Sequence, residues 1–333
     1  PTFDPNNTKN VSPALMRNPS VQDVYEPGST GKVMTLAAAL EEKKITPETV
    51  LTVPYSIKRG GDTFHDHERH PVQQLTTSGI LAVSSNTGTI QIGEMLSNNS
   101  LHDYLTKFGI GISTGSGLPG ESAGLFRPVS DWSGTTAPTV AFGQGYSVTA
   151  MQATSVFATI ANDGVRVSPT VIAGTTDSSG KYTAAAGRTS ERVVSAQTAQ
   201  QLRIMMESVV SGQGTAPSAA IPGYRVAGKT GTAMRYNSAC SCYSGYTASF
   251  IGFAPADAPK YVISVTIQDP KGAYYGGSLG GPVFKKVMTF VLQSEHVAPT
   301  GTKVLPIALT QAELRKQERR EKAITTQASL KSR

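Results

Sequence analysis

The sequence predicts an α/β protein in which an antiparallel sheet is flanked by helices and joined to a second subdomain rich in helix. Three observations lead to this fold class. The last third of the chain holds three short runs rich in β-branched and aromatic residues, separated by turn residues. The first half shows helical periodicity, and a long middle segment is dense in Gly, Ser, Thr and Pro.

The first half of the chain begins with an irregular arm over residues 1–27, rich in Asn and Pro. Residues 29–42 are expected to form a helix, because apolar side chains recur on one face of the segment. Residues 71–96 predict two helical stretches, broken at residues 84–86. Residues 109–150 show little periodicity and are expected to be irregular.

The second half alternates helices with short strands. Residues 148–161 predict a buried helix, and residues 196–210 an amphipathic one, with a turn at residues 177–180 between short strands. The expected sheet is a meander, closed by a final helix. Its strands cover residues 225–233, 246–254 and 261–268, and the final helix covers residues 281–292.

Size and composition suit a globular domain with a sizeable core. The chain has 333 residues, 38% of them hydrophobic and 16% charged. Mean hydropathy is −0.17 and no apolar run reaches the length of a membrane span. Because the chain starts at Pro1 without a signal-type segment, we expect a processed or truncated piece of a longer protein.

The net charge of +7 is concentrated in the C-terminal segment. Residues 299–333 hold eight basic and three acidic side chains, so the rest of the chain is nearly neutral. A basic tail is not a charged groove, and nucleic acid is therefore not an expected partner. We expect residues 1–298 to form the functional domain and residues 299–333 a basic, flexible, partly helical tail. Contact of the tail with anionic lipid or wall polymer is the alternative.

The two cysteines, Cys240 and Cys242, are separated by one residue. A metal site needs more ligands at other spacings, and a disulfide here would close a cramped ring. Cysteine usage therefore does not fix the compartment, and the role and redox state of the pair are left open.

Three short motifs carry chemistry in combination. Ser29-Thr30-Gly31-Lys32 places a hydroxyl and an amine on one face of a helix start, but the bare pattern also occurs at Ser178 to Lys181, in a turn. Ser84-Ser85-Asn86 alone is typical of a helix-capping cluster. Lys229-Thr230-Gly231-Thr232 alone is typical of an edge strand, in which glycine permits a close approach to the backbone.

In this order, the three motifs are the set shared by serine β-lactamases and penicillin-binding proteins. From about residue 3 to about residue 292, the chain resembles the transpeptidase domain of class B penicillin-binding proteins, close to the septal, cell-division type. Further matches are Tyr25-Glu26-Pro27-Gly28-Ser29, Phe142-Gly143-Gln144-Gly145-Tyr146, Thr247-Ala248-Ser249-Phe250-Ile251-Gly252-Phe253 and Gly276-Gly277-Ser278.

The resemblance implies a catalytic role for each of three side chains. Ser29 would attack the carbonyl between two D-alanines of a stem peptide, forming an acyl-enzyme, with Lys32 as its base. Ser84 would pass a proton to the departing D-alanine. The backbone N–H groups of Ser29 and Thr232 would form the oxyanion hole, and an amine of a second stem peptide would take the acyl group.

The resemblance also implies substrate-binding residues and partners. Asn86 would hold the donor peptide, and Thr230 and Thr232, with Gly231 between them, would bind its terminal carboxylate near the positive charge of Lys229. No cofactor or metal is implied. The implied partners are peptidoglycan stem peptides, β-lactam antibiotics and divisome membrane proteins including a glycosyltransferase, at the outer face of the bacterial plasma membrane.

In the family, two sheet strands, a pedestal domain and an anchoring membrane helix precede the segment that starts at Phe3. The sheet of this chain is therefore expected to lack its first strands, and the anchor to lie outside the chain. The insertion around Cys240 departs from the family pattern and is expected beside the mouth of the active site.

Two features could mislead. The cluster His65, Asp66, His67, Glu68 and His70 resembles a metal site, but neighbouring ligands on an extended segment point to opposite faces, which argues against one. The family resemblance implies a structural role for this segment. Glu121 lies where a serine β-lactamase carries its deacylating base, but no other element fits. The alternatives that remain are a D,D-carboxypeptidase, a serine β-lactamase and a non-enzymatic β-lactam sensor.

Overall fold

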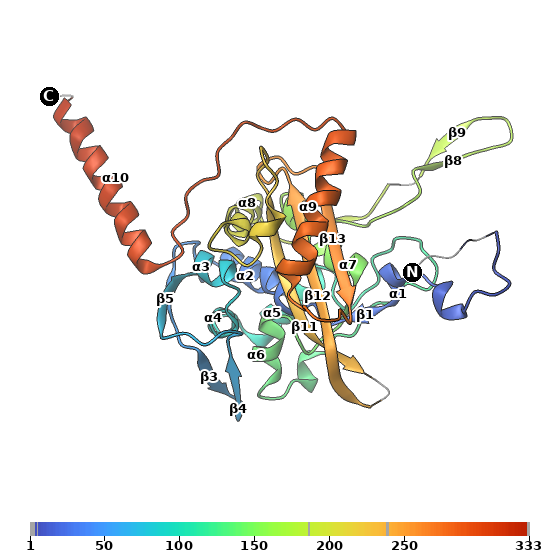
Figure 1. Cartoon of the computed structure of the whole chain (residues 1–333), viewed down its shortest axis with the longest axis horizontal. Helices are drawn as coiled ribbons and strands as arrows, with labels where there is room; N and C mark the ends of the chain where they lie inside the picture. The colour runs from blue at the N-terminus through green and yellow to red at the C-terminus, as the bar shows by residue number, and fades with distance from the viewer. Residues whose placement is uncertain (1–3, 5, 186, 238–239, 332–333) are drawn as a thin grey trace.

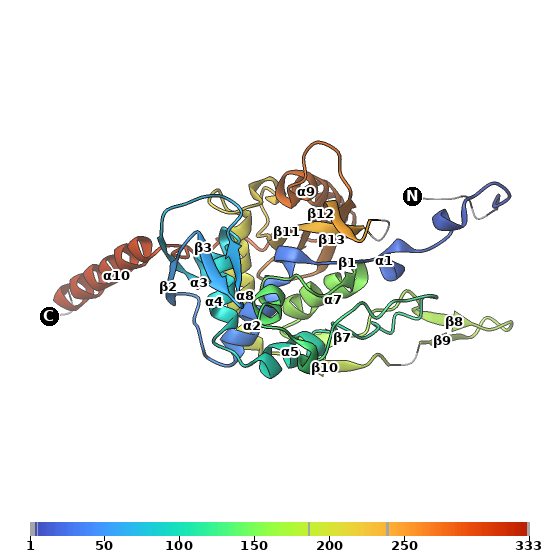
Figure 2. The same ribbon diagram turned by 90° about the horizontal axis from the view of Figure 1, so that it is seen from below.

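The computed structural model of the chain describes residue 4 and residues 6–185, 187–237 and 240–331. A three-stranded antiparallel sheet, β11–β12–β13, lies at its centre. Helix α9 covers one face of the sheet, and α2, α7 and α8 lie on the other, which gives three layers (Figures 1 and 2). This architecture confirms the predicted fold class.

The sheet is built from one long hairpin and a third strand. Within the hairpin Lys229 pairs with Ile251 and Thr232 with Ala248, so the Lys-Thr-Gly-Thr segment lies on β11, one of the two outer strands of the sheet. The hairpin extends beyond both predicted strand ends, to Asn237 and Cys242, as an exposed ribbon. Tyr236 and Tyr243 stack edge to face there, which stabilises the ribbon beyond the core.

Local signals explain why the helices begin where they do. Thr149 and Gln152 form a capping box at the start of α7, each side chain accepting a hydrogen bond from the backbone N–H of the other.

Helix α9 packs on the opposite face of the sheet through aromatic side chains. Phe250 of β12 packs edge to face on Phe284 of α9, with ring centroids 4.8 Å apart. Both rings are fully buried and join α9 to the sheet.

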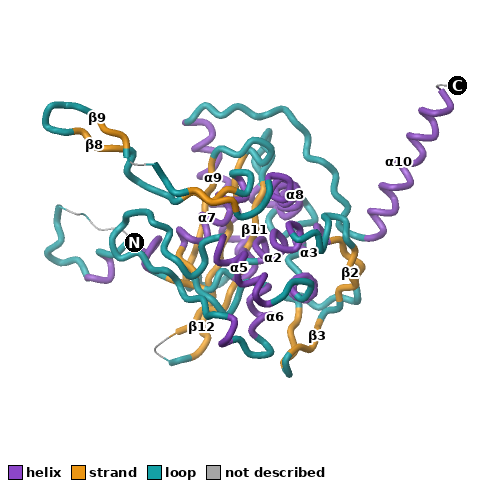
Figure 3. The backbone as a smooth tube through the Cα atoms, turned by 180° about the vertical axis from the view of Figure 1, so that it is seen from behind, coloured by secondary structure: helices purple, strands orange, loops and turns teal. Residues whose placement is uncertain are grey.

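A smaller subdomain lies beside α2 and contains α3, α4 and the short strand pairs β2–β5 and β3–β4. The C-terminal segment leaves α9 and crosses to this subdomain along the upper edge of the molecule in Figures 1 and 3, before α10 projects away from it. Ala308 and Leu309 are buried in that crossing, which the sequence analysis did not foresee.

The helices and strands have the following bounds. The helices are α1 (Pro19–Gln22), α2 (Lys32–Glu41), α3 (Thr77–Ala82), α4 (Asn86–Gly93), α5 (Asn98–Lys107), α6 (Thr136–Ala141), α7 (Ala150–Ala161), α8 (Ala196–Glu207), α9 (Gly276–Ser294) and α10 (Gln311–Lys331). The strands are β1 (Val24–Tyr25), β2 (Val50–Val53), β3 (Ser56–Arg59), β4 (Asp62–His65), β5 (Gln73–Thr76), β6 (Val148–Thr149), β7 (Val165–Val167), β8 (Gly174–Thr176), β9 (Tyr182–Ala184), β10 (Ser190–Arg192), β11 (Ala227–Asn237), β12 (Cys242–Ala254) and β13 (Tyr261–Gln268).

Most predicted elements are present with shifted ends. The break predicted at residues 84–86 separates α3 from α4, and the turn at residues 177–180 joins β8 to β9. The final helix starts five residues earlier than predicted, at Gly276. Residues 109–150, expected to be irregular, contain the short helix α6.

Cys240 and Cys242 form a disulfide at the tip of the β11–β12 hairpin. The small ring that the sequence analysis described as cramped is therefore closed, and the redox state that it left open is the disulfide. The pair does not lie among the residues that line the cavity around Ser29. Across the described residues, no helix combines the length and the apolar character that crossing a membrane requires.

Candidate active site

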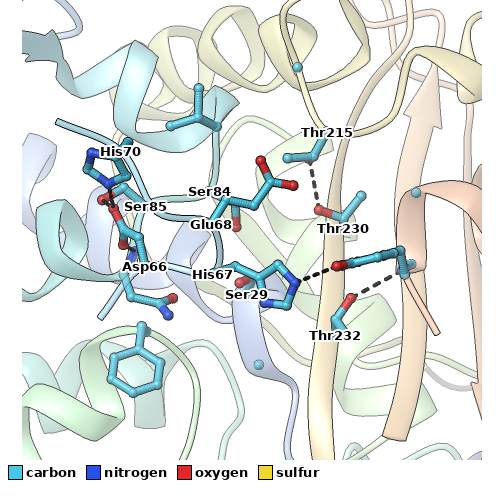
Figure 4. A pocket seen from close by; sticks show the side chains of 18 of the residues that line it. Ser29, Asp66, His67, Glu68, His70, Ser84, Ser85, Thr215, Thr230 and Thr232 are labelled. Atoms are coloured by element: carbon cyan, nitrogen blue, oxygen red, sulfur yellow. Dashed lines mark hydrogen bonds and ion pairs between the residues drawn. The ribbon is translucent and has the colours of Figure 1, made fainter. Parts of the chain in front are cut away.

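Ser29 lies in a cavity of about 640 Å³ between the central sheet and the smaller subdomain (Figure 4). Ser84, Asn86, Thr230 and Thr232 line the same cavity. The structure therefore brings together all three motifs, although the first and the last begin 200 residues apart, at Ser29 and Lys229.

The serine lies on a single 3-10 turn, Gly28–Thr30, and not within the helix that the sequence predicted. Helix α2 begins only at Lys32. Two contacts hold the turn: the Thr30 hydroxyl donates to the carbonyl of Pro27 at 2.8 Å, and the Gly28 amide donates to the carbonyl of Gly143 at 2.8 Å. The segment around Gly143 thus supports the turn that presents Ser29.

The amine of Lys32 is fully buried and points into the smaller subdomain. It donates to the Ser84 carbonyl at 2.5 Å and to Asn86 Oδ1 at 2.7 Å, and lies 3.3 Å from Ser84 Oγ. Within the described residues, these are its hydrogen bonds, and Ser29 Oγ is not among its partners. Burial lowers the pKa of Lys32 from 10.5 to about 7, although the Asp66 carboxylate opposes the shift.

This arrangement suits a neutral amine. A neutral lysine has two hydrogens and one lone pair, and the two carbonyl-type acceptors at 2.5 and 2.7 Å use both hydrogens. The lone pair of Lys32 is then left for a hydroxyl proton, which is what a general base requires.

A second lysine reaches the same hydroxyl from the sheet. Lys229 Nζ is fully buried and donates to Ser84 Oγ at 2.8 Å. Burial lowers the pKa of Lys229 well below its usual value, and the charge of Lys32 lowers it further. Ser84 Oγ therefore lies between two desolvated amines, one from each wall of the cavity.

The backbone of Ser84 is in the left-handed region, with φ of 61°. The residue lies in the short break between α3 and α4, where the chain turns sharply before Ser85 caps α4 by accepting from the Gly88 amide at 2.9 Å. Non-glycine residues are strained in this conformation. The carbonyl of Ser84 accepts the Lys32 bond, and this contact helps to hold the strained turn.

The Lys-Thr-Gly-Thr segment presents its two threonine hydroxyls to the cavity (Figure 4). Thr230 Oγ1 lies 2.9 Å from Thr215 Oγ1, and Thr232 Oγ1 accepts from the Gly276 amide at 3.2 Å. The backbone of Gly231 packs against the turn that carries Ser29: a Cβ there would lie 2.9 Å from the carbonyl of Pro27. The close approach that the strand glycine predicted is thus made by the protein itself.

Asp66 was named from the sequence only as part of the histidine cluster, and its contact with the start of α4 was missed. Its buried carboxylate accepts from Ser85 Oγ at 2.7 Å, from the Thr87 amide at 2.9 Å and from His70 Nε2 at 3.0 Å, and also from the Asn86 amide. It therefore fixes the start of α4 and, with it, the turn that carries Ser84. A carboxylate about 20 residues ahead of a Ser-x-Asn turn was the only signal available.

We expect Asp66→Asn to lower the free energy of unfolding by about 3 kcal/mol, because an amide cannot accept from every donor that surrounds the carboxylate. Loss of the nearby negative charge should also lower the pKa of Lys32 further, since Asp66 raises it. Thermal unfolding tests the first effect. The exposed Asp62→Asn is the matched control, and equal melting temperatures for the two variants would contradict this role of Asp66.

The histidines around Asp66 face separate partners and do not converge on one point. His65 Nδ1 contacts the Asp66 carbonyl, His70 pairs with the Asp66 carboxylate, and His67 Nε2 bonds to Tyr275 Oη at 2.7 Å. The described residues contain no group of side chains arranged to hold a metal ion. The structural role expected for this segment matches its contacts.

The bond between His67 and Tyr275 joins the two walls of the cavity (Figure 4). His67 belongs to the smaller subdomain and Tyr275 precedes α9, and both line the cavity with Ser29. Their rings also pack edge to face, 5.1 Å apart.

Glu121 does not line the cavity around Ser29. Its carboxylate accepts from the amide and hydroxyl of Thr114 and from Ser116. Burial acts to raise the pKa of Glu121, but these hydrogen bonds outweigh it and lower the pKa. The carboxylate is thus a structural acceptor within its own loop, and the β-lactamase alternative loses its candidate base.

Comparison with known proteins agrees with this geometry. The family model described as the penicillin binding protein transpeptidase domain matches residues 1–289. The chain is 42% identical to penicillin-binding protein PbpB of Mycobacterium tuberculosis over 307 residues, covering 89% of this chain and 45% of that protein. It is 35% identical to peptidoglycan D,D-transpeptidase FtsI of Escherichia coli, covering 90% of this chain and 49% of that protein.

A solved structure shows the same fold. Penicillin-binding protein 3 of M. tuberculosis, complexed with ampicillin, superposes with a TM-score of 0.84 at 42% identity, covering 88% of this chain and 67% of that one. The chain spans a little under half the length of the curated relatives described above. It belongs to the penicillin-binding-protein transpeptidase family and is similar to that family's septal, class B members.

Proposed function

We propose that this chain is the D,D-transpeptidase domain of a septal cell-wall enzyme, with Ser29 as the acylated nucleophile. The observation that carries the proposal is the position of Ser84 Oγ between the buried amines of Lys32 and Lys229, in the cavity that holds Ser29. A hydroxyl held by two amines of lowered pKa can relay a proton between a nucleophile and a leaving group.

In the first half-reaction, neutral Lys32 accepts the proton of the Ser29 hydroxyl as Oγ attacks the carbonyl between two D-alanines. The backbone N–H groups of Ser29 and Thr232 donate to the oxyanion that develops. As the C–N bond breaks, the departing D-alanine nitrogen receives a proton through Ser84, which is reprotonated from the protonated Lys32. An ester on Ser29 and free D-alanine result.

The residues in and behind the cavity wall support the proposed substrate-binding roles. Thr230 and Thr232 present hydroxyls for the terminal carboxylate, on either side of Gly231, and Lys229 adds positive potential from behind. Asn86 holds the amide of the donor peptide. In the absence of substrate its carboxamide is oriented by Lys32 and by the carbonyl of His65, to which it donates at 3.0 Å.

In the second half-reaction, an amine of another stem peptide attacks the ester. The amine loses its proton to the Lys32–Ser84 pair, and Ser29 regains one as it departs. A β-lactam would acylate Ser29 in the same way but leave an ester that turns over slowly. The relative of known structure that was crystallised with ampicillin supports this part of the proposal.

The septal assignment extends to location and partners. We infer that the domain works at the outer face of the bacterial plasma membrane, held there by an N-terminal helix, beside divisome membrane proteins including a glycosyltransferase. The similarity to the protein named FtsI, and to stage V sporulation protein D of Bacillus subtilis at 34% identity, supports this inference.

Intact-mass spectrometry after incubation with benzylpenicillin tests the proposal. One penicillin mass should be added, on the peptide that contains Ser29, and Ser29→Ala should remain unlabelled. Ser178→Ala is the matched control, because Ser178 begins a second Ser-x-x-Lys pattern, in the exposed turn between β8 and β9. Label on the Ser29→Ala protein would refute the assignment.

A depsipeptide substrate with an added amine acceptor separates the remaining alternatives. A D,D-carboxypeptidase would release only the hydrolysed product, whereas a transpeptidase would form the amide with the acceptor. A sensor domain would be acylated by penicillin but would turn over neither substrate.

A further inference from the structure

The C-terminal segment from Val297 to Thr310 runs along the upper edge of the molecule, from α9 beside the central sheet to the smaller subdomain (Figures 1 and 3). We refer to these residues as the strap. We propose that the strap positions Ser84 against Lys229, and so sets the geometry in which Ser29 is acylated. The inference rests on the function proposed above, and it concerns residues outside the 1–289 match to the family.

One end of the strap is fixed to the central sheet. Tyr224 Oη, just ahead of β11, donates to the carbonyl of Val297 at 2.6 Å. Thr302 Oγ1 accepts from Arg225 Nη1 at 3.2 Å and donates to the carboxylate of Asp257, which follows β12. These bonds hold the strap to the ends of the two strands that carry the Lys-Thr-Gly-Thr segment and its partner.

The other end of the strap is fixed to the smaller subdomain. The Thr76 amide donates to the carbonyl of Leu309 at 3.0 Å, and Thr76 Oγ1 donates to the carbonyl of Ala308 at 2.7 Å. Thr310 forms a bridge with Leu75 of β5. Glu313, at the start of α10, closes this end by accepting from the Leu309 amide at 2.7 Å.

The strap packs so closely on α3 that position 79 has no room for a side chain. A Cβ at Gly79 would lie 1.9 Å from the carbonyl oxygen of Leu309, so the strap rests directly on the helix backbone. Thr76 also caps α3, because its hydroxyl accepts from the Gly79 amide at 3.0 Å. The strap and the helix cap thus share one side chain.

Helix α3 is the element that carries the strap's influence into the site. It is six residues long, all of them buried, and Ser84 follows its last residue by two positions. The Ser84 hydroxyl lies 2.8 Å from Lys229 Nζ, across the boundary between the two walls. A displacement of α3 by a fraction of an ångström would change this distance and loosen the contact of Lys32 with Ser84, and misplacements of about 1 Å can cost about a hundredfold in rate.

Truncation tests the proposal, with acylation by a fluorescent penicillin as the readout. A chain ending at Ala298 lacks most of the strap, and a chain ending at Lys316 keeps the strap but loses most of α10. We expect the first to be acylated about tenfold to a hundredfold more slowly than the full chain, and the second at the full rate.

A pH profile separates positioning from stability. If the turn at Ser84 loosens, Lys32 becomes better hydrated and its pKa rises toward the usual value, so the acidic limb of the acylation rate should move to higher pH. Gly79→Ala, with Gly212→Ala as the control at an open position, makes the same test in a full-length chain should the truncated one not fold.

The proposal is supported if the strap variants are acylated more slowly and their acidic limb moves upward. It is overturned if they are acylated as fast as the full chain, or if their acylation rate falls while the acidic limb of its pH profile stays at the same pH. Failure of the proposed function is distinguishable, because in that case the full chain itself would not be acylated.

Discussion

Replacement of Lys32 by arginine should slow acylation of Ser29 by at least about a thousandfold. Arginine keeps a positive charge but cannot give up its proton at accessible pH, so it cannot act as a base. The fully buried site also has no room to solvate a guanidinium. In the unmodified chain, the acylation rate should rise about tenfold per pH unit up to the Lys32 pKa of about 7 and then level off.

Lys32→Met separates the base from the charge. It should be as inactive as Lys32→Arg but more stable than the unmodified chain at pH 7. Between about pH 7 and 10.5 the unfolded chain binds more protons than the folded one at this residue, so the stability of the unmodified chain rises with pH there. The advantage of the methionine variant should therefore shrink over the same window. Acylation of Lys32→Arg at a rate within tenfold of the unmodified chain would contradict the assignment.

Replacement of Ser84 by glycine should reduce acylation about a hundredfold to ten-thousandfold while raising stability by about 1 kcal/mol. The hydroxyl between Lys32 and Lys229 is lost, so no group relays the proton to the leaving nitrogen. At a φ of 61°, glycine relieves strain that serine bears. A substitution that lowers the acylation rate while it raises the free energy of unfolding indicates that the strained backbone at Ser84 serves function rather than stability.

The control for this variant is Lys43→Gly. Lys43 has a φ of 58° at the exposed end of α2, so the change relieves similar strain without touching the cavity. It should stabilise the protein by a similar amount and leave acylation unchanged. If Ser84→Gly were acylated at the rate of Lys43→Gly, the relay role of Ser84 would be wrong.

The three short motifs were predictable because each combines side-chain chemistry with a local backbone signal. Ser29 precedes a segment with helical periodicity, and Ser84 interrupts another. Lys229 lies in a segment whose β-branched residues predict a strand. Their meeting in one cavity was predictable only from the order of the motifs, since no local pattern encodes contacts between residues 200 positions apart.

Other features of the structure could not be predicted from short sequence patterns. Asp66 acts through the backbone N–H groups of a turn 20 residues away, a contact that leaves no periodicity in the sequence. The part of the hairpin beyond Ala233 was not predicted, because its exposed side chains lack the alternation of apolar and polar residues that marks a half-buried strand. The buried crossing at Ala308 and Leu309 is held mainly by main-chain carbonyls, which every sequence possesses.

The contact of His67 with Tyr275 has a topological consequence. A donor stem peptide has one free end, so it can enter the cleft beneath the His67–Tyr275 contact while that contact stays intact. When donor and acceptor enter from opposite ends of the cleft, the cross-linked product is a chain tethered to a glycan strand on both sides. Under the proposed function such a chain has no free end to withdraw, so we expect the bond between His67 and Tyr275 to open before the cross-linked product leaves.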